Sequence, residues 1–273
     1  MVYKPSPKPD YLKSTLIKYS SIKTHMWGDK ISGYVKDWIY VSNRHLHQII
    51  FGLKPNSNFK HSESFRTIFG ADEYLYVLSG ILLISNPKTG EVKRVEEGQS
   101  VFFEKDTWHH AFNYSNKELQ VLEFFSPPPI TGTSGIYAKK RPYLKKNLYQ
   151  RKFSINPLRK SGYKNSLEIL KNENINWSLH GKNQELLLGD IINTKHLKIK
   201  IIKLKGFQKS PPLSFKYHSC FFSLSNNLQF NINLSKRLRV LKYRDSVYLI
   251  KGDNLTIKNN SKIEASLIIC EGI

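Results

Sequence analysis

The sequence has little cysteine and no long apolar run. Its 273 residues include two cysteines, Cys220 and Cys270, too few for a disulfide framework. No apolar run approaches the roughly eighteen residues of a membrane span. The N-terminal stretch Met-Val-Tyr-Lys-Pro-Ser-Pro also lacks the apolar core of a signal peptide. We therefore expect a cytoplasmic protein with no membrane partner.

Negative charge is also scarce. The chain has 43 Lys and Arg residues against 21 Asp and Glu residues, a formal net charge of +22. One interpretation is attraction to a polyanion or to an anionic small molecule; the other is a lysine-rich composition spread over solvated faces. Basic residues crowd together in residues 139–159, but no helix-turn-helix, zinc-finger or RNP pattern accompanies them. We expect a small-molecule substrate, with an anionic one left open, and not a nucleic acid.

What the sequence does have is a series of short apolar stretches separated by turn residues. The stretches at 74–84, 92–95, 100–103 and 119–125 are expected to be strands. The turns between them are rich in Asn, Pro and Gly, as in residues 86–90 and 96–98. Short strands with turns every eight to twelve positions or so predict an all-β sandwich or barrel.

Two sets of spaced residues lie within this frame. Glu73 is followed by Gly80 with six residues between them. Gly98 is followed by His109 with ten residues between them, and Asn113 comes four positions after His109. This arrangement resembles the two signature motifs of the cupin superfamily over about residues 40–126. The resemblance implies a jelly-roll β-barrel.

The sequence departs from the cupin pattern in two places. Glu104 and Asp106 occupy the positions where the second motif usually has Pro and Gly. The His-x-His of the first motif is missing, and its usual positions are occupied by Arg66 or Thr67 and by Ile68 or Phe69.

The resemblance implies a divalent metal bound by Glu73 and His109. His61 is our choice for the third ligand, if the loop of residues 62–72 lets it reach the site. Glu63 faces the same side of an extended segment and could supply a further ligand. Imidazole and carboxylate ligands with open positions suit Fe(II), which we favour, and also Mn, Ni or Zn.

Three other histidines compete for a place at this site. His45 and His47 form a literal His-x-His one strand earlier, and strand alternation predicts that both point to one face. His110 should point to the side opposite His109.

Tyr76, Arg66 and Trp108 could line the pocket. Tyr76 would act as a proton donor, Arg66 as a clamp for an anion, and Trp108 as an apolar wall. For each of them, simple packing or a surface contact is the alternative.

The second half of the chain suggests a faint repeat of the first. An offset of 146 residues takes Asn113 to Asn259, but it takes His109 to Leu255 and Glu73 to Ser219. The expected organisation is an N-terminal arm (1–29), a cupin domain with the metal site (30–126), a basic, partly helical linker (127–175) and a cupin domain without ligands (176–273). Residues 166–172 are expected to form one of the helical pieces. The fold class is therefore tandem jelly-roll barrels.

Two functions remain open. The first is a metal-dependent enzyme that acts on a small organic acid or other polar metabolite, with oxygenation as the first choice and a lyase or isomerase reaction second. The alternative is a non-catalytic binding module for a sugar or metabolite, which the missing His-x-His favours. A homodimer is left open.

Overall fold

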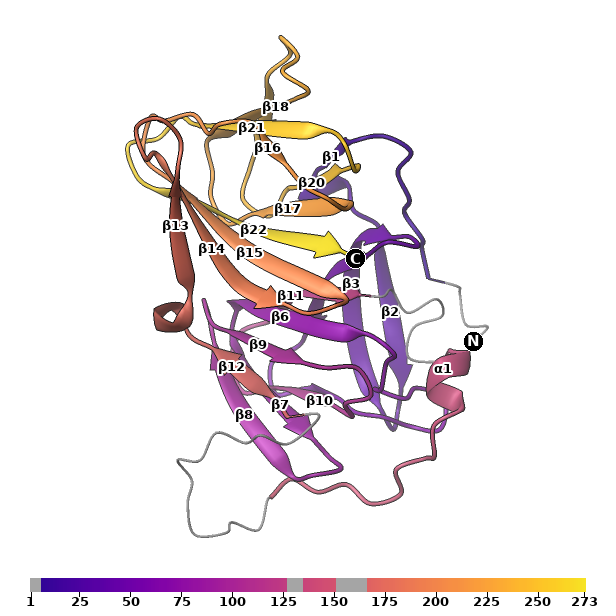
Figure 1. Ribbon diagram of the computed structural model, residues 1–273. Helices are drawn as coiled ribbons and strands as arrows, with labels where there is room; N and C mark the ends of the chain where they lie inside the picture. The colour runs from indigo at the N-terminus through magenta and orange to yellow at the C-terminus, as the bar shows by residue number, and fades with distance from the viewer. Residues whose placement is uncertain (1–5, 127–134, 151–165) are drawn as a thin grey trace. The chain divides into compact units, whose positions relative to one another are not determined.

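The structure, a computed structural model, describes residues 6–126, 135–150 and 166–273. These residues form two compact units built almost entirely from antiparallel strands (Figure 1). A short helix, α1 (Ile136–Lys139), lies in the segment predicted as a linker. The predicted all-β class, with two jelly-roll barrels, is confirmed. No helix among the described residues is long and apolar enough to cross a membrane.

The first unit contains Thr24–Ile39 and His47–Asn172 and is drawn mainly in purple in Figure 1. Its seven-stranded sheet has the order β12-β9-β6-β11-β4-β3-β2, and its four-stranded sheet has the order β5-β10-β7-β8. Apolar side chains of both sheets, such as Leu75 and Ile84, form one core. The strands are β2 (Thr24–Asp29), β3 (Gly33–Ser42), β4 (His47–Leu53), β5 (Asn58–Phe59), β6 (Asp72–Ser79), β7 (Ile81–Asn86), β8 (Glu91–Glu96), β9 (Ser100–Phe103), β10 (His110–Asn113), β11 (Leu119–Ser126) and β12 (Glu168–Leu170).

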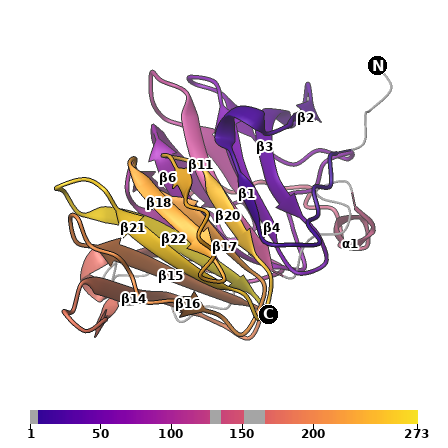
Figure 2. The same cartoon turned by 90° about the horizontal axis from the view of Figure 1, so that it is seen from above.

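The second unit contains Lys8–Lys23, Tyr40–Leu46 and Glu173–Ile273. Its seven-stranded sheet has the order β1-β20-β17-β22-β15-β14-β13, part of which is seen from above in Figure 2. Its four-stranded sheet has the order β16-β21-β18-β19. The strands are β1 (Thr15–Ile17), β13 (Asn176–His180), β14 (Leu186–Asn193), β15 (Leu197–Leu204), β16 (Leu213–Ser214), β17 (Ser219–Ser223), β18 (Leu228–Ile232), β19 (Arg239–Leu241), β20 (Ser246–Leu249), β21 (Asn254–Asn259) and β22 (Ala265–Gly272), with the short 3-10 helices η1 (Tyr19–Ser21) and η3 (Asn172–Asn174).

A buried asparagine occupies the same place in both units. The Asn113 amide donates hydrogen bonds to the carbonyls of Leu53, Lys54 and Lys117 at 2.8–3.1 Å, and its oxygen accepts from Ser115. Asn259 bonds in the same way to the carbonyls of Leu204, Lys205 and Ile263, and its oxygen accepts from Ser261. Asn113 and Asn259, Ser115 and Ser261, and Lys117 and Ile263 are each 146 residues apart. The predicted repeat offset therefore holds at the level of hydrogen bonds.

The turns before these asparagines also repeat. Gly98 has a φ of 82° and donates its N–H to the Val77 carbonyl at 2.9 Å. At the offset of 146, Arg244 has a φ of 69° and donates to the Ser223 carbonyl at 2.9 Å. Asp106, at the usual Gly position of the second motif, has a φ of 65°. The backbone thus keeps the left-handed turn without glycine, since Asp tolerates this region better than most residues.

Three local predictions need correction. Residues 166–172 do not form a helical piece, because residues 168–170 are strand β12, which pairs with the edge of β9 through Ile169 and Val101. The predicted strand 74–84 is two strands, because Gly80 turns the chain with a φ of 88°. Residues 15–17, in the predicted N-terminal arm, pair with β20 as strand β1.

The unit boundaries also differ from the predicted ones. Residues 8–23 and 40–46 belong to the second unit, and the first unit extends to Asn172 because it includes β12. Residues 127–134 and 151–165 of the predicted linker lie outside the described residues, as does part of its basic cluster.

Replacing Asn113 with Ala should destabilise the first unit by about 1–3 kcal/mol, because three carbonyls lose their donor. Asn259→Ala should have a similar effect on the second unit. The measurement is the midpoint of urea unfolding. Asn116→Ala, an exposed neighbour in the same turn, is the matched control. Equal midpoints for Asn113→Ala and the control would contradict the structural role of this amide.

Candidate functional site

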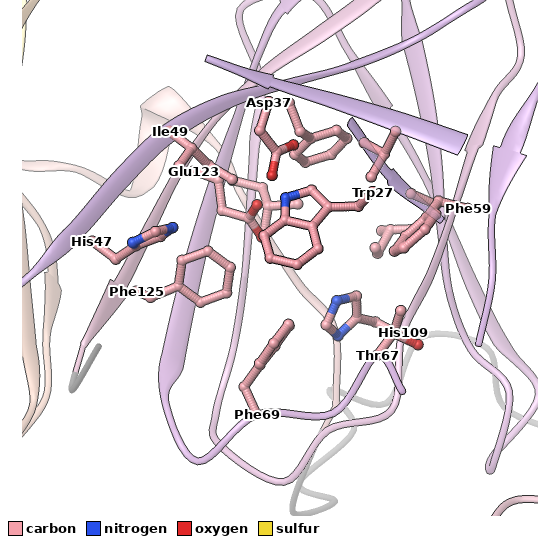
Figure 3. Close-up of a pocket in the computed structure, with 15 residues that line it drawn as sticks. Trp27, Asp37, His47, Ile49, Phe59, Thr67, Phe69, His109, Glu123 and Phe125 are labelled. Carbon is pink, nitrogen blue, oxygen red and sulfur yellow. The ribbon is translucent and has the colours of Figure 1, made fainter. Parts of the chain in front are cut away.

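The barrel of the first unit encloses a cavity between its two sheets. Fifteen residues line it, most of them apolar or aromatic (Figure 3). The volume open to the centres of water-sized molecules is about 90 Å³, room for several waters or for a ligand of a few heavy atoms. The lining residues are Trp27, Val35, Asp37, His47, Ile49, Phe51, Phe59, Thr67, Phe69, Leu75, Ile84, His109, Ala111, Glu123 and Phe125.

The residues that replace the missing His-x-His face this cavity. The N–H groups of Asp106 and His109 donate to the carbonyls of Phe69 and Thr67 at 2.8 and 3.1 Å, so this extended segment runs beside His109. Alternation then directs both Thr67 and Phe69 to the cavity wall. Of the two pairs of positions left open by the sequence, Thr67 and Phe69 are therefore the pair that occupies the ligand positions.

The structure brings the two motif ligands together. His109 Nε2 lies 3.8 Å from Glu73 Oε2. Glu73 also shares a side-chain hydrogen bond with Glu123, and both carboxyls are almost completely buried. Burial raises the pKa of Glu73 and of Glu123 well above the usual range. The neighbouring Glu123 raises the pKa of Glu73 further, and Asp37 raises that of Glu123 further. Burial and the neighbouring carboxyls therefore both favour the protonated form of this pair.

Two further ionisable residues line the cavity from β3 and β4. Burial raises the pKa of Asp37 to about 8, against an opposing hydrogen bond from Trp27. Burial lowers the pKa of His47 to about 4, and that of His109 likewise to about 4. At neutral pH both imidazoles are therefore uncharged and Asp37 is mostly protonated.

Several buried polar atoms around this cavity have no hydrogen-bond partner within residues 6–126, 135–150 and 166–273. They are Asp37 Oδ1, His47 Nδ1, Thr67 Oγ1 and Glu73 Oε2. The first three belong to residues of the cavity wall, and Figure 3 shows Asp37 and His47 on one side of the cavity and Thr67 on the other. Since buried polar groups are nearly always paired, a ligand that pairs with them would remove a substantial energetic cost.

His61 does not join Glu73 and His109. Its Nε2 lies 2.9 Å from the Leu144 carbonyl, and its Nδ1 lies 2.7 Å from His110 Nε2. Because a carbonyl can only accept, His61 Nε2 carries the proton, and the lone pair of Nδ1 accepts from His110. His110 Nδ1 in turn accepts from the Tyr149 hydroxyl at 3.0 Å. Both nitrogens of His61 are therefore occupied. Neither His61 nor its partner His110 is among the residues that line the cavity, whereas His109 is.

The other predicted pocket residues also lie outside the cavity wall. Arg66 donates to the carbonyl of Lys139, the last residue of helix α1, at 3.1 Å and to that of Arg141 at 2.7 Å, and it forms an ion pair with the exposed Glu63. Trp108 packs in a separate cluster with Ile68 and Ala138. Tyr76 alternates with the core residues Leu75 and Val77, so it points away from the core.

His45 and His47 do not share a face. Strand β4 begins at His47, so strand alternation does not extend back to His45. The backbone N–H of His45 is instead bound by the Asn43 side chain, and its ring stacks on His218 at 3.9 Å in the second unit.

The second unit lacks an equivalent site among its described residues. Leu255 is fully buried in the apolar core, and the Ser219 hydroxyl donates to the Tyr217 carbonyl at 3.0 Å. Both positions therefore serve packing and local bonding.

The residues of the first cavity do not fit a resident catalytic metal. Glu73 and His109 remain of the motif ligands, while Thr67 and Phe69 replace the histidines. Across residues 6–126, 135–150 and 166–273, no three His, Cys, Asp or Glu side chains are grouped in a way that could hold a metal ion. The buried carboxyls instead bond to each other.

Asp37 and Glu123 were not among the residues expected at the site, whereas His47 was expected as a competing histidine together with His45. Glu123 did leave a signal, because it is the one charged residue in the apolar stretch 119–125. Asp37 left none, and the His-x-His did not show that His47 lines the cavity without His45, because these strands become neighbours only in the closed barrel.

Comparisons with known proteins agree with this architecture. A protein-family model, "Cupin domain", matches residues 70–125. One similar solved structure is the putative glyoxylate induced protein from Pseudomonas aeruginosa, with a TM-score of 0.66 and 11% sequence identity. The superposition covers 99% of this chain and 93% of that protein. The superposition with oxalate decarboxylase from Bacillus subtilis covers 97% of this chain and 78% of that protein, with a TM-score of 0.63 and 11% identity. The superposition with Ylba from E. coli covers 96% of this chain and 91% of that protein, with a TM-score of 0.61 and 12% identity. No curated protein matches the sequence.

Two jelly-roll units with repeated turns and a ligand-sized cavity in the first define a double-barrel protein. The cupin match covers the positions of Glu73, Gly98 and His109. The first unit therefore contains a cupin domain over residues 70–125, and the fold of the chain is similar to the folds of these solved structures. At sequence identities near 11%, these structural similarities show the fold and do not identify a ligand.

Replacing both Thr67 and Phe69 with His should create a metal site, because both side chains face the cavity beside His109. We expect the affinity for Mn(II) or Fe(II) to rise about 100-fold. This is the upper end of the effect of a residue that only hydrogen-bonds to a metal ligand. The measurement is calorimetric titration with elemental analysis of the purified variant. Arg66→His with Ile68→His adds the same two side chains on the opposite face and is the matched control. Equal gains in both variants would contradict the assigned facing.

Replacing Asp37 with Asn should make stability less dependent on pH. The folded-state pKa of Asp37 is raised to about 8, so the unfolded chain ionises first and stability falls between about pH 4 and pH 8. Asp37→Asn should therefore be more stable than the original chain at pH 7, by about 2 kcal/mol or more, and should lose less stability across this range. Urea unfolding at several pH values measures the effect. Parallel curves for both proteins would show that Asp37 is ionised in the folded state.

Proposed function

We propose that the chain is a non-catalytic binding module whose first barrel holds a small uncharged molecule in its cavity. The observation that carries this proposal is the chemistry of the cavity wall. Two motif ligand positions are Thr67 and Phe69, and the remaining ionisable groups favour uncharged forms at neutral pH.

The absence of a basic residue from the wall supports an uncharged ligand. None of the fifteen lining residues is Lys or Arg, so an organic anion would enter an apolar cavity without a counter-charge, at a high desolvation cost. An uncharged ligand with hydroxyl or amide groups avoids this cost. It can bond to Asp37 Oδ1, His47 Nδ1 and Thr67 Oγ1, which have no hydrogen-bond partner among the described residues. The net charge of +22 acts outside the cavity and does not change this local balance.

A metal-dependent enzyme is the second candidate, favoured by one observation. Glu73 Oε2 has no hydrogen-bond partner in the part of the chain that the structure describes, and it lies 3.8 Å from His109 Nε2, as two ligands of one ion would. This candidate would act on a small organic acid or polar metabolite, by oxygenation first and by a lyase or isomerase reaction second. The names of two structural neighbours, an oxalate decarboxylase and a glyoxylate induced protein, agree with an organic acid.

One experiment separates the two candidates. The purified protein is reconstituted with Fe(II), Mn(II), Ni(II) or Zn(II) and analysed for metal, and its melting temperature is measured with small alcohols, polyols and amides and with oxalate and glyoxylate. Stabilisation by uncharged compounds without stoichiometric metal supports the binding module. Stoichiometric metal, together with stabilisation by an acid, supports the enzyme.

For any uncharged compound that binds, Thr67→Val should weaken affinity by about fivefold to tenfold, because one hydroxyl is removed at constant shape. Thr89→Val, an exposed position in the turn between β7 and β8, is the control. Calorimetric titration measures both. Unchanged affinity in Thr67→Val would place the ligand outside this cavity.

A further inference from the structure

The loop between β18 and β19 in the second unit exposes large apolar side chains. Leu234 is 61% exposed, Leu238 is 53% exposed, and Val240 at the start of the edge strand is 51% exposed. We call residues 233–240 the β18–β19 tip. This loop extends beyond the strands of its sheet in Figure 1. Three exposed aliphatic side chains within seven residues are unusual for a loop that faces only water.

The β18–β19 tip is also strongly basic. Lys236, Arg237 and Arg239 lie between the apolar residues, and Lys242 follows them. No acidic residue occurs from position 228 to position 244. Among the ion pairs found in the described residues, none uses these four side chains. Their charge is therefore available to an external partner.

The base of the tip is held firmly in place. Asn233 donates its side-chain amide to Asp253 at 2.7 Å, and its side-chain oxygen accepts the N–H of Asn254 at 2.9 Å. The Ser235 N–H closes the turn on the Ile232 carbonyl at 3.1 Å. Leu234 has a φ of 52°, a left-handed conformation that is costly for a bulky residue. Such strain is retained mostly where the surroundings or function require it, and here it keeps a leucine exposed.

We propose that the β18–β19 tip binds the surface of an anionic lipid membrane. The leucines would enter the boundary between headgroups and acyl chains, while the basic residues contact anionic headgroups. Lipid fits better than nucleic acid because the exposed apolar residues are aliphatic, whereas single-stranded nucleic acid is held mainly by stacking on aromatic rings. The expectation of no membrane partner rested on the absence of an apolar run long enough to span a membrane. A short exposed tip that binds a membrane surface does not require such a run.

The test is co-sedimentation of the full chain with vesicles of phosphatidylcholine alone or with about 30% phosphatidylserine. We expect binding to the anionic vesicles only, and weaker binding as salt rises from 0.1 M to 1 M, because the Debye length falls from about 10 to about 3 Å. Leu234→Ser with Leu238→Ser should weaken binding about tenfold. Lys236→Ser with Arg237→Ser should weaken it by tenfold or more, about as expected for two basic residues at such a surface.

Ile263→Ser is the matched control. Ile263 is 68% exposed and lies in the turn after β21, beyond the end of β18 opposite the tip, since Leu228 pairs with Asn259 and Ile232 with Leu255. It should leave binding unchanged. Equal binding to both kinds of vesicle, binding to neither, or an equal loss in the control would overturn the proposal. Binding of an RNA oligomer that is lost only in Lys236→Ser with Arg237→Ser would also overturn it. So would a dimer of the original chain that becomes a monomer in Leu234→Ser with Leu238→Ser.

Discussion

The amide of Asn113 is the interaction on which the geometry of the first barrel depends. It binds carbonyls of the β4 end and of the turn before β11, and so holds three chain segments together at the end of the β4–β11 ladder, whose last pair is Leu53 with Leu119. Asn259 makes the same contacts in the second barrel, which lacks the motif histidine and glutamate. This cupin residue therefore serves the fold alone, and its presence does not indicate a metal site.

The cavity of the first barrel follows a different constraint, the cost of burying charge. Glu73, Glu123 and Asp37 lie close together with no Lys or Arg among the lining residues, so each is held toward its protonated form. The imidazoles of His47 and His109 are held uncharged by the same burial. The result is a hydrogen-bonding cavity without net charge in a chain whose surface is strongly positive.

Local spacing places some of the predicted site residues together but does not determine where others lie. Glu73 and His109 lie 3.8 Å apart, as the motif spacing led us to expect. His61 was misplaced because the loop of residues 62–72 is too long for spacing to determine a direction, and a hydrogen bond to the Leu144 carbonyl, more than eighty residues later, decides its position. Arg66 was assigned to the pocket, although its partners are carbonyls at the end of helix α1 and just after it.

The sequence by itself determined the all-β class, the cupin motif of the first unit and the repeat offset of 146, because these depend on local periodicity and on turn residues with positive φ. Only the tertiary structure decided which polar residues share the cavity, since Asp37, His47 and Glu123 come from three strands that become neighbours through barrel closure. It also decided that residues 168–170 form a strand, because the free edge of β9 offers hydrogen bonds that a short isolated helix cannot match.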